Sequence, residues 1–247
     1  MKKDNYEYKV GKVIENKEVA KGIFKLSIEG EFQGKPGQFY MLRSWEKEPI
    51  LWRPISIHNI GSNSIEFLYQ LVGEGTRLLS NLIPGQEVKA MGPLGNGFDL
   101  EGIKGKVAVV SGGIGVAPMR YLVDSIKNSE VHVFAGFRDE IYGLEDIETL
   151  GISVKVSTEN GNVGHKGYVT ELFSPKNYDI VLCCGPEVMM YRVINMCREV
   201  GTKIYISEEK KMACGIGACL VCTCKTVNGN KRTCKDGPVF NGLDLEF

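Results

Sequence analysis

Short runs of alternating apolar and polar residues, broken by glycine and proline, fill the first hundred residues of the chain. The clearest of these runs cover residues 22–28, 38–43, 54–58 and 64–71. Alternation with a period of two indicates strands that bury one face, and evenly spaced short strands favour a small antiparallel barrel. We therefore expect residues 1–99 to form a β-barrel domain.

Near residue 100 the pattern changes to apolar strands that alternate with helices. Strands are predicted at residues 106–110, 131–135, 153–157 and 178–184, with helices over about 119–127 and after residue 187. This alternation is typical of a parallel sheet that is buried on both faces. We expect residues 100–209 to form an α/β domain and residues 210–247 to form a third, small segment. The predicted fold class is a multi-domain β plus α/β chain.

The last segment carries cysteines at the spacing of a metal centre. Cys214, Cys219 and Cys222 form a C-x4-C-x2-C loop, and Cys234 returns after a predicted hairpin turn at residues 228–230. This is the spacing of plant-type two-iron ferredoxins, so four thiolates could hold a [2Fe-2S] cluster here. The small residues inside the loop allow the backbone to wrap around a cluster and to aim N–H groups at its sulfurs.

Two alternatives and one ambiguity remain at this centre. A structural zinc site usually pairs its cysteines at both ends, whereas Cys234 stands alone. A disulfide scaffold is disfavoured because nothing else in the sequence indicates secretion. Eleven residues separate Cys222 from Cys234, fewer than in most plant-type ferredoxins, and Cys224 is a spare thiol nearby. The C-x2-C pair formed by Cys219 and Cys222 favours Cys222 as the ligand.

The charges of the chain argue against nucleic acid or an anionic membrane as a partner. Its 30 Lys and Arg residues balance its 30 Asp and Glu residues. No apolar run approaches the ~18 residues that a membrane-spanning helix needs. Residues 1–6 contain no apolar signal core, and eight cysteines without a signal peptide favour metal ligation in a reducing, cytoplasmic compartment.

Two motifs in the predicted barrel point to a flavin. The run Arg53-Pro54-Ile55-Ser56 lies on a predicted strand, and residues 73–76 form a glycine-containing turn into a helix, whose free N–H groups favour a phosphate. Taken alone, the run Arg53–Ser56 could be an ordinary exposed edge strand. Together and in this order they resemble the flavin-binding barrel of the ferredoxin–NADP reductase superfamily. The resemblance implies FAD, held by Arg53, Pro54, Ile55, Ser56, Leu68, Tyr69, Gln70, Gly75 and Thr76.

Two residue assignments in this half stay open. Tyr69 could instead be a structural residue of its strand with no role in binding, since aromatic residues are common in strands. Residues 91–97 contain too much glycine and proline for regular structure, so we expect a tight loop beneath the flavin, an interdomain linker, or both.

The second domain contains a glycine-rich turn between a strand and a helix, an arrangement that binds a pyrophosphate. The turn reads G-G-x-G-x-x-P from Gly112 to Pro118, and it resembles the pyridine-nucleotide domain of the same superfamily. Further on, Asp139 would suit a ribose 2′-hydroxyl and Arg138 a 2′-phosphate; we favour NADH. The resemblance places NAD(H) on Gly112, Gly113, Ile114, Gly115, Asp139, Cys184, Gly185 and Pro186.

No residue receives a certain catalytic role. Cys184 is expected near the contact between nicotinamide and flavin, without acting as a nucleophile, because no histidine is near it in sequence. Cys183 and Cys197 are expected to be buried apolar residues. His58 and His165 are expected on the surface, and His132 alternates with core residues. None of the three receives a catalytic role, since hydride transfer between two cofactors needs positioning more than acid–base chemistry.

The order of the three predicted sites describes an electron path. NADH exchanges two electrons, a two-iron cluster exchanges one at a time, and a flavin can do both. No residues remain for an organic-substrate pocket, so we expect electrons to pass to or from another protein. Four apolar residues would form a rim around the cluster, either covered by that partner or shielding the cluster within this chain: Met212, Ile216, Leu220 and Val221.

The whole chain resembles the electron-transfer subunits of the two-protein, NAD-linked dihydroorotate dehydrogenases of type B. The local matches are residues 69–79, 92–98, 212–219 and 234–240. The resemblance implies an FMN-containing catalytic subunit of TIM-barrel fold that oxidises dihydroorotate to orotate in pyrimidine (UMP) biosynthesis. It also implies that electrons pass from FMN through the cluster to FAD and NAD+, in a heterotetramer of two plus two subunits.

Other protein classes remain as alternatives at this point. The flavin subunit of an NADH-dependent ferredoxin:NADP oxidoreductase, or of a sulfhydrogenase, shares all three modules. A non-catalytic redox sensor could carry the cluster beside a degenerate nucleotide domain, although the intact motifs argue against it. A zinc-bearing binding module is a further alternative, and the colour of the purified protein would distinguish it.

Overall fold

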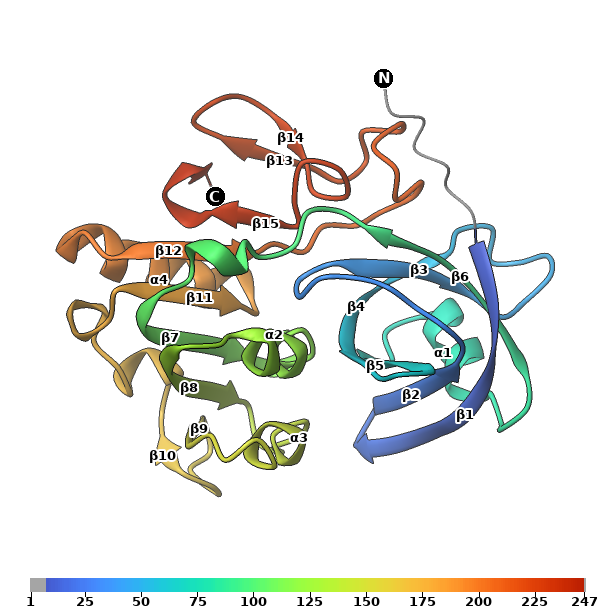
Figure 1. Cartoon of the computed structure of the whole chain (residues 1–247), viewed down its shortest axis with the longest axis horizontal. Coiled ribbons are helices and arrows are strands. Elements are labelled where there is room, and N and C mark those ends of the chain that lie inside the picture. Colours follow the sequence, from blue (N-terminus) through green and yellow to red (C-terminus); the bar gives the residue numbers. More distant parts are fainter. Residues whose placement is uncertain (1–7, 247) are drawn as a thin grey trace.

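The computed structural model describes residues 8–246, in three parts that pack against one another (Figure 1). The barrel and the sheet lie side by side, and the C-terminal segment lies across the same end of both. The prediction that residues 1–6 carry no signal core falls outside the described residues.

The first part is a closed barrel of six antiparallel strands in the order β1-β2-β5-β4-β3-β6. Its strands are β1 (Tyr8–Ala20), β2 (Ile23–Glu29), β3 (Phe39–Arg43), β4 (Arg53–Ile60), β5 (Ser64–Gln70) and β6 (Glu87–Leu94). The short helix α1 (Glu74–Ser80) lies between β5 and β6 in the chain. Alternate residues such as Leu26, Tyr40 and Phe67 are fully buried inside the barrel, as the period-two pattern predicts.

The prediction of an irregular loop at residues 91–97 is wrong in its first half, because β6 continues to Leu94. Gly92 belongs to the strand for a packing reason. The ring of Tyr40 occupies the space of a side chain there, and a Cβ on Gly92 would lie 2.5 Å from the Tyr40 ring. A glycine that looks like a strand breaker in sequence is therefore needed by the barrel core.

The second part is a sheet of seven strands in the order β10-β9-β8-β7-β11-β12-β15. Its strands are β7 (Gly105–Gly112), β8 (Ser129–Phe137), β9 (Val154–Thr158), β10 (His165–Lys166), β11 (Ile180–Cys184), β12 (Lys203–Ser207) and β15 (Val239–Asn241). All pair in parallel except β15, which is antiparallel to β12. The predicted α/β architecture is confirmed.

Helices cover both faces of this sheet. They are α2 (Met119–Ser125), α3 (Glu145–Glu148) and α4 (Glu187–Val200). Val107 and Val109 of β7 pack in the apolar cluster beneath α2 and α3, whereas Ala108 and Val110 pack in the cluster beneath α4. Successive residues of one strand therefore serve opposite layers, which explains why its sequence is continuously apolar.

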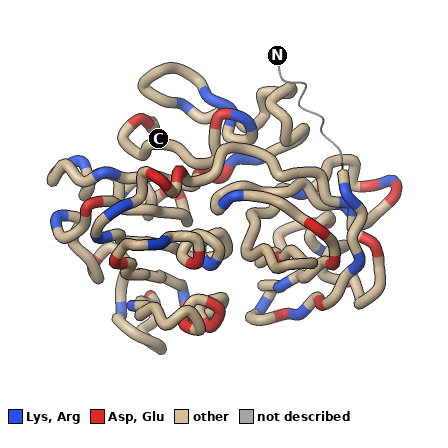
Figure 2. Tube along the Cα trace, viewed as in Figure 1, with Lys and Arg blue, Asp and Glu red and all other residues tan. Residues whose placement is uncertain are grey.

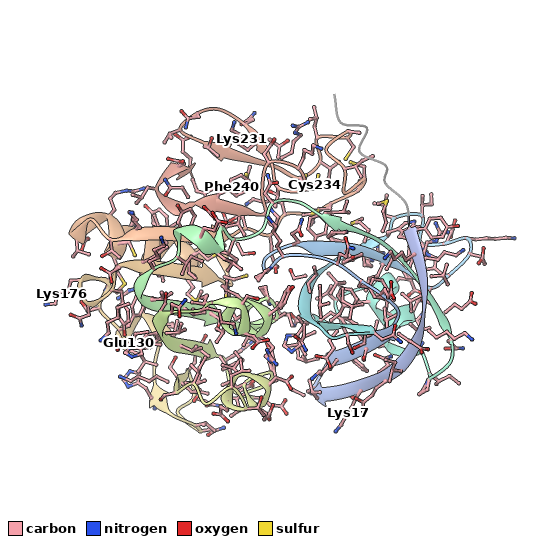
Figure 3. The ribbon with its side chains drawn as sticks, viewed as in Figure 1. Lys17, Glu130, Lys176, Lys231, Cys234 and Phe240 are labelled. Atoms are coloured by element: carbon pink, nitrogen blue, oxygen red, sulfur yellow. The ribbon has the colours of Figure 1, made fainter. Side chains whose placement is uncertain are left out.

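The third part contains β13 (Thr223–Thr226), β14 (Lys231–Arg232) and β16 (Leu245–Glu246), which form a small sheet in the order β14-β13-β16. The same segment contributes β15 to the large sheet, where Phe240, labelled in Figure 3, pairs with Ile206 of β12. Its backbone also bonds to the end of the barrel, since the Val239 N–H donates to the carbonyl of Asn96 at 3.3 Å. The segment is thus attached to both larger parts.

Single-turn 3₁₀ helices complete the described chain at Leu100–Gly102, Gly113–Val116, Val169–Glu171, Pro175–Asn177 and Gly242–Asp244. Among residues 8–246, no helix has the length and apolar character required to cross a membrane. Acidic and basic residues are interspersed along all three parts (Figure 2), in agreement with the balanced charge of the sequence.

Candidate functional site

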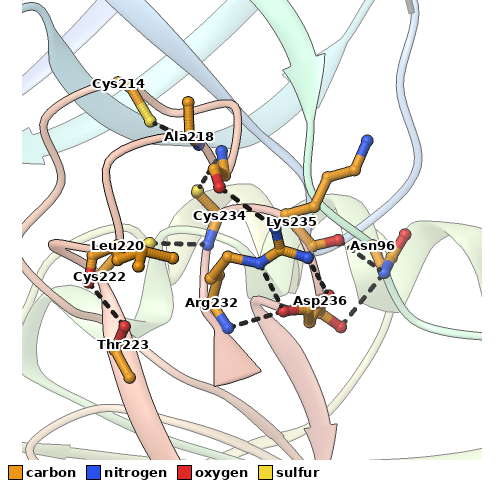
Figure 4. A network of polar contacts seen from close by, with 11 residues as sticks. Asn96, Cys214, Ala218, Leu220, Cys222, Thr223, Arg232, Cys234, Lys235 and Asp236 are labelled. Atoms are coloured by element: carbon orange, nitrogen blue, oxygen red, sulfur yellow. Dashed lines mark hydrogen bonds and ion pairs between the residues drawn. The ribbon is translucent and has the colours of Figure 1, made fainter. Parts of the chain in front are cut away.

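The four predicted cluster ligands come together where the C-terminal segment meets the barrel. Their thiols interact in two pairs, Cys214 with Cys219 and Cys222 with Cys234. Backbone N–H groups point at the sulfurs (Figure 4): Gly217 to Cys234 Sγ at 3.1 Å, Ala218 to Cys214 Sγ at 3.3 Å, and Cys234 to Cys222 Sγ at 3.4 Å. Two pairs of sulfurs with N–H donors aimed at them fit a cluster of two irons.

The ionisation of these thiols follows from the same geometry. Burial raises the pKa of Cys214, but the backbone N–H groups of Ile216, Cys219 and Ala218 outweigh burial and lower the pKa to about 6. Burial and the neighbouring Cys222 raise the pKa of Cys234 to about 12. Thiolates this close repel one another unless positive charge lies between them, as a metal centre provides.

The four thiols lie as two pairs, and within residues 8–246 no group of three or more His, Cys, Asp or Glu side chains is close enough to hold a single metal ion. The spare Cys224 is buried elsewhere, among apolar residues beneath α4 that include Ile206 and Leu245. Its placement favours Cys222 as the ligand.

The cysteine loop has its own support. The guanidinium of Arg232 pairs with Asp236 (Nε to Oδ2, 3.0 Å) and donates to the carbonyl of Gly217 at 3.2 Å (Figure 4). Gly217 has φ of +81°, a conformation that favours glycine. Cys222 and Cys234 pack against Phe39, Met41 and Leu94 of the barrel. The cluster loop is therefore built against the barrel wall.

The predicted apolar rim divides into two halves. Met212 and Ile216 pack against the barrel side of the cluster loop and are partly buried. Leu220 and Val221 are 62% and 55% exposed. One half thus shields the loop within the chain, and the other half is free to contact another molecule.

Eight of the nine residues predicted to bind flavin line one cavity of about 310 Å³ between the three parts. They are Arg53, Pro54, Ile55, Ser56, Leu68, Tyr69, Gln70 and Thr76. The ninth, Gly75, packs directly against the Arg53 guanidinium, which occupies the space where a side chain would extend. The cavity also reaches Met212 and Pro238 of the C-terminal segment. The flavin motifs, separated in sequence, therefore meet in one place.

The turn before α1 is held by one side chain. Thr76 Oγ1 accepts from the N–H groups of Val72 and Gly73 at 3.0 and 3.1 Å, and it donates to the Gly73 carbonyl at 2.8 Å. Arg53 is fixed beside this turn by donation from Nη1 to the Leu51 carbonyl at 2.9 Å. A phosphate at this end of the cavity would meet a preoriented guanidinium.

Seven of the eight residues predicted to bind NAD(H) line a second cavity of about 980 Å³ at the carboxyl ends of the sheet strands. They are Gly112, Gly113, Ile114, Gly115, Asp139, Gly185 and Pro186. Cys184 does not line this cavity. It is buried at the end of β11, and its thiol is hydrogen-bonded to the Ser207 side chain. Its carbonyl carbon packs against Gly115, where a Cβ would lie 2.6 Å away.

A third cavity, of about 540 Å³, continues over the same strand ends and shares five residues with the second: Gly112, Gly113, Phe137, Arg138 and Pro186. The sequence missed its other lining residues, among them Ser157, Tyr168, Thr170 and Arg192. Ser157 Oγ and Thr170 Oγ1 are buried and have no hydrogen-bond partner among the described residues. A polar ligand or a water molecule in this cavity would complete their hydrogen bonds. No local motif marks these positions.

The cavities of about 310 and 980 Å³ meet at four residues that line both: Gln70, Ile114, Glu208 and Glu209. Glu208 is 2% exposed and pairs with Lys210 Nζ at 3.0 Å. Burial raises the pKa of Glu208, and its second carboxyl oxygen has no partner among residues 8–246. A buried carboxyl group therefore lies at the junction of the two sites.

The prediction that His58 lies on the surface is wrong. Its side chain is fully buried between the barrel and the second part, whereas His165 is exposed as expected. Cys183 and Cys197 are fully buried, as predicted. The position of His58 depends on how α2 packs against β4, a contact between distant segments that local sequence does not contain.

The chain is similar to known proteins over nearly its full length. Residues 209–246 match the family model described as "Iron-sulfur cluster binding domain of dihydroorotate dehydrogenase B". Two relatives are named dihydroorotate dehydrogenase B (NAD+), electron transfer subunit. The one from Clostridium acetobutylicum is 57% identical and covers 97% of each chain. The one from Clostridium perfringens is 51% identical and covers 98% of this chain and 99% of its own.

Solved structures share the fold. A chain from the structure of the NADH-dependent reduced ferredoxin-NADP oxidoreductase, described for flavin-based electron bifurcation, superposes with a TM-score of 0.86. It is 25% identical and covers 96% of this chain and 89% of that one. A ferredoxin NADP+ reductase from Neisseria gonorrhoeae with bound FAD and NADP superposes with a TM-score of 0.66. It is 15% identical and covers 78% of this chain and 92% of that one.

Proposed function

The chain belongs to the family of electron transfer subunits of NAD-dependent dihydroorotate dehydrogenase B, and on that premise we propose that it delivers electrons from a dihydroorotate-oxidising partner to NAD+. The observation that carries this proposal is the continuity of the three sites. The flavin cavity reaches Met212 and Pro238 beside the cluster loop, and it joins the nucleotide cavity at Gln70 and Ile114.

The residues present fit the three groups that the proposal requires. FAD would be held by Arg53–Ser56, Leu68–Gln70, Gly75 and Thr76, and a [2Fe-2S] cluster by Cys214, Cys219, Cys222 and Cys234. NAD(H) would lie across Gly112–Gly115 and Gly185-Pro186. When bound, the flavin can exchange electron pairs with NAD(H) and single electrons with the cluster. The protein supplies fixed spacing, N–H donors toward sulfur, and the Arg53 guanidinium.

The nucleotide is proposed to be NADH rather than NADPH. Asp139 lines the second cavity, while Arg138 lines the second and third cavities. A carboxylate favours a ribose 2′-hydroxyl and opposes a 2′-phosphate. Cys184, buried behind this surface, would contribute through its backbone beside Gly115. We also propose the division into an FAD-binding barrel over residues 1–99, an NAD-binding domain over 100–209 and a cluster domain over 210–247.

The partner is proposed to be an FMN-containing catalytic subunit, in a cytoplasmic heterotetramer of two plus two that serves pyrimidine biosynthesis. The exposed Leu220 and Val221 beside the cysteines support a contact there, because apolar side chains this exposed are well suited to burial against a second protein.

A ferredoxin:NADP-type function remains as the second candidate. It is favoured by the TM-score of 0.86 with the NADH-dependent reduced ferredoxin-NADP oxidoreductase chain. The much higher identity of 57% to a dihydroorotate dehydrogenase B subunit favours the first proposal. A sulfhydrogenase subunit, a redox sensor or a zinc module has no observation of its own in its favour.

Anaerobic titration of the purified chain with NADH tests the proposal. We expect the flavin absorbance to bleach, followed by an electron paramagnetic resonance signal of a reduced two-iron cluster. The catalytic subunit and dihydroorotate should then produce the same reduced state without NADH. Reduction by NADPH but not by NADH would favour the ferredoxin:NADP-type candidate, and absence of flavin and iron would contradict both.

Arg53→Ala should weaken flavin retention by about 10- to 100-fold, because a charge-assisted hydrogen bond contributes about 1.5–3 kcal/mol. The measurement is the ratio of flavin to protein after gel filtration, together with a dissociation constant from flavin fluorescence. Arg77→Ala is the matched control: this arginine lies on α1, is exposed and pairs with Glu74 at 2.6 Å. Equal flavin content in the two variants would show that Arg53 does not hold the flavin.

A further inference from the structure

His58 joins the barrel to the second part through both nitrogens of its ring. It lies on β4, two residues after Ser56, which lines the 310 Å³ cavity, and next to Ile57, which packs in the barrel core. Nδ1 lies 2.6 Å from the Ala117 carbonyl oxygen, and Nε2 lies 3.2 Å from Asp146 Oδ2. The His58 side chain is 0% exposed, and the Asp146 side chain is 34% exposed.

These contacts determine which protons the ring carries. A carbonyl oxygen accepts a hydrogen bond and cannot donate one, and the same is true of an ionised carboxylate. A neutral imidazole has one N–H and could satisfy only one of the two acceptors. Both contacts are hydrogen bonds only if the ring is an imidazolium with two N–H groups. The buried positive charge is then balanced by the carboxylate of Asp146.

The surrounding charges agree with an ionised Asp146. Its contact with His58 holds the pKa of Asp146 well below its usual range, against burial, and Lys25 on β2 lowers it further. Lys25 Nζ lies 2.7 Å from Asp146 Oδ2 and 3.8 Å from Glu66 Oε1 on β5. Asp146 therefore receives one cation from β4 and another from β2, both on the barrel.

The elements that His58 joins are those that carry the two cofactor motifs. Ala117 follows the glycine-rich turn directly, and its N–H donates to the Ile114 carbonyl at 2.9 Å. Ile114 and Ala117 both line the flavin cavity. We propose that His58, as an imidazolium, is a positioning residue that sets the spacing between the flavin strand and the nucleotide turn; this rests on the function proposed above.

Hydride transfer is sensitive to such spacing, because a misplacement of ~1 Å can cost about 10²-fold in rate. Other contacts also hold the same interface: the Tyr121 hydroxyl donates to the Gly34 carbonyl at 3.0 Å, and Lys25 pairs with Asp146 at 2.7 Å. Loss of the His58 contacts should therefore leave the barrel and the second part together but shift their relative position. Affinity for each cofactor should change little, whereas the transfer between them should slow.

The test uses the full chain with its flavin bound. His58→Asn retains a donor near the position of Nδ1, His58→Gln retains one near Nε2, and Asp146→Asn removes the balancing charge. His132→Gln is the matched control, since His132 is on β8 and bonds to Tyr178 Oη at 2.9 Å and to Glu130 at 3.0 Å, away from the barrel. Stopped-flow reduction of the flavin by NADH gives a limiting rate and a half-saturating concentration.

We expect the limiting rate of flavin reduction to fall about 10- to 100-fold in the three test variants. The half-saturating NADH concentration should change less than about 3-fold, and the flavin content should not change. The effects of His58→Gln and Asp146→Asn should not add in the double variant. Rates within 2-fold of the unmodified chain, or rates that fall only in proportion to flavin loss, would overturn the proposal.

A second measurement does not depend on turnover or on the variants folding. ¹⁵N chemical shifts of the His58 ring in the unmodified chain should report a proton on each ring nitrogen, as the two acceptor contacts require. A single protonated nitrogen would overturn the imidazolium and the proposal with it. If the flavin of the unmodified chain is not reduced by NADH at all, the proposed function fails, while the ring shifts still decide the state of His58.

Discussion

Replacing Cys222 by serine is expected to remove the iron–sulfur cluster while leaving the flavin and nucleotide sites filled. Cys222 is buried, pairs with Cys234 and receives the Cys234 N–H at 3.4 Å, so no other sulfur can take its place without moving the loop. Loss of one ligand should reduce cluster content more than 10-fold, since even outer-shell changes cost about 10- to 100-fold. Iron and labile-sulfide analysis, with the two-iron paramagnetic signal, measures this.

Cys224→Ser provides the matched control for that variant. It removes a thiol two residues away that packs with Ile206 and Leu245 instead of the cluster loop. Cluster content should stay near that of the unmodified chain, and NADH-to-dye activity should persist in both variants. A cluster that survives Cys222→Ser and is lost in Cys224→Ser would reverse the ligand assignment. Loss of flavin in Cys222→Ser would contradict the separation of the two sites.

Gly115→Ala is expected to weaken NADH binding by about 10-fold or more and to leave flavin and cluster in place. A Cβ at position 115 would lie 2.6 Å from the carbonyl carbon of Cys184 and 2.7 Å from Gly185 Cα, and backbone atoms cannot rotate away. Such overpacking costs about 1–3 kcal/mol, and it would push apart the two turns that line the nucleotide cavity.

The measurement is NADH affinity by titration, with thermal unfolding recorded in parallel. Gly102→Ala is the control, because a Cβ there would meet only the Asp99 side chain, at 3.2 Å, and Gly102 does not line the nucleotide cavity. We expect its NADH affinity to match that of the unmodified chain. Unchanged affinity in Gly115→Ala would mean that the nucleotide does not use the turn at residues 112–115.

Most of the fold could be predicted because its signals are local. The period-two alternation in β2 and β5 and the apolar run of β7 follow directly from which faces are buried. The family was also accessible, and the resemblance to dihydroorotate dehydrogenase B subunits is confirmed by relatives of 57% and 51% identity. The ligand residues themselves stay predictions, although the structure brings the motif residues together.

What could not be predicted depends on contacts between segments far apart in the chain. His58 has the local sequence of an exposed strand residue, and only the packing of α2 against β4 buries it. Gly92 resembles a strand breaker until the Tyr40 ring is placed beside it. Tyr168 and Arg192 meet in one cavity from different elements, with no motif to connect them. Each case requires the tertiary structure, because the decisive neighbour is remote in sequence.

The strand β15 gives the cysteine segment a second role, as a protective cap. It pairs with β12 along Tyr205–Ser207, and without it β12 would be an exposed edge strand at the border of the large sheet. An uncovered border of unpaired N–H and C=O groups invites pairing with other molecules. A chain shortened before residue 239 would therefore tend to self-associate instead of behaving as a simpler flavoprotein. The predicted cluster ligands and the strand that covers this border therefore belong to the same short piece of chain, and a truncation that removes both loses both roles.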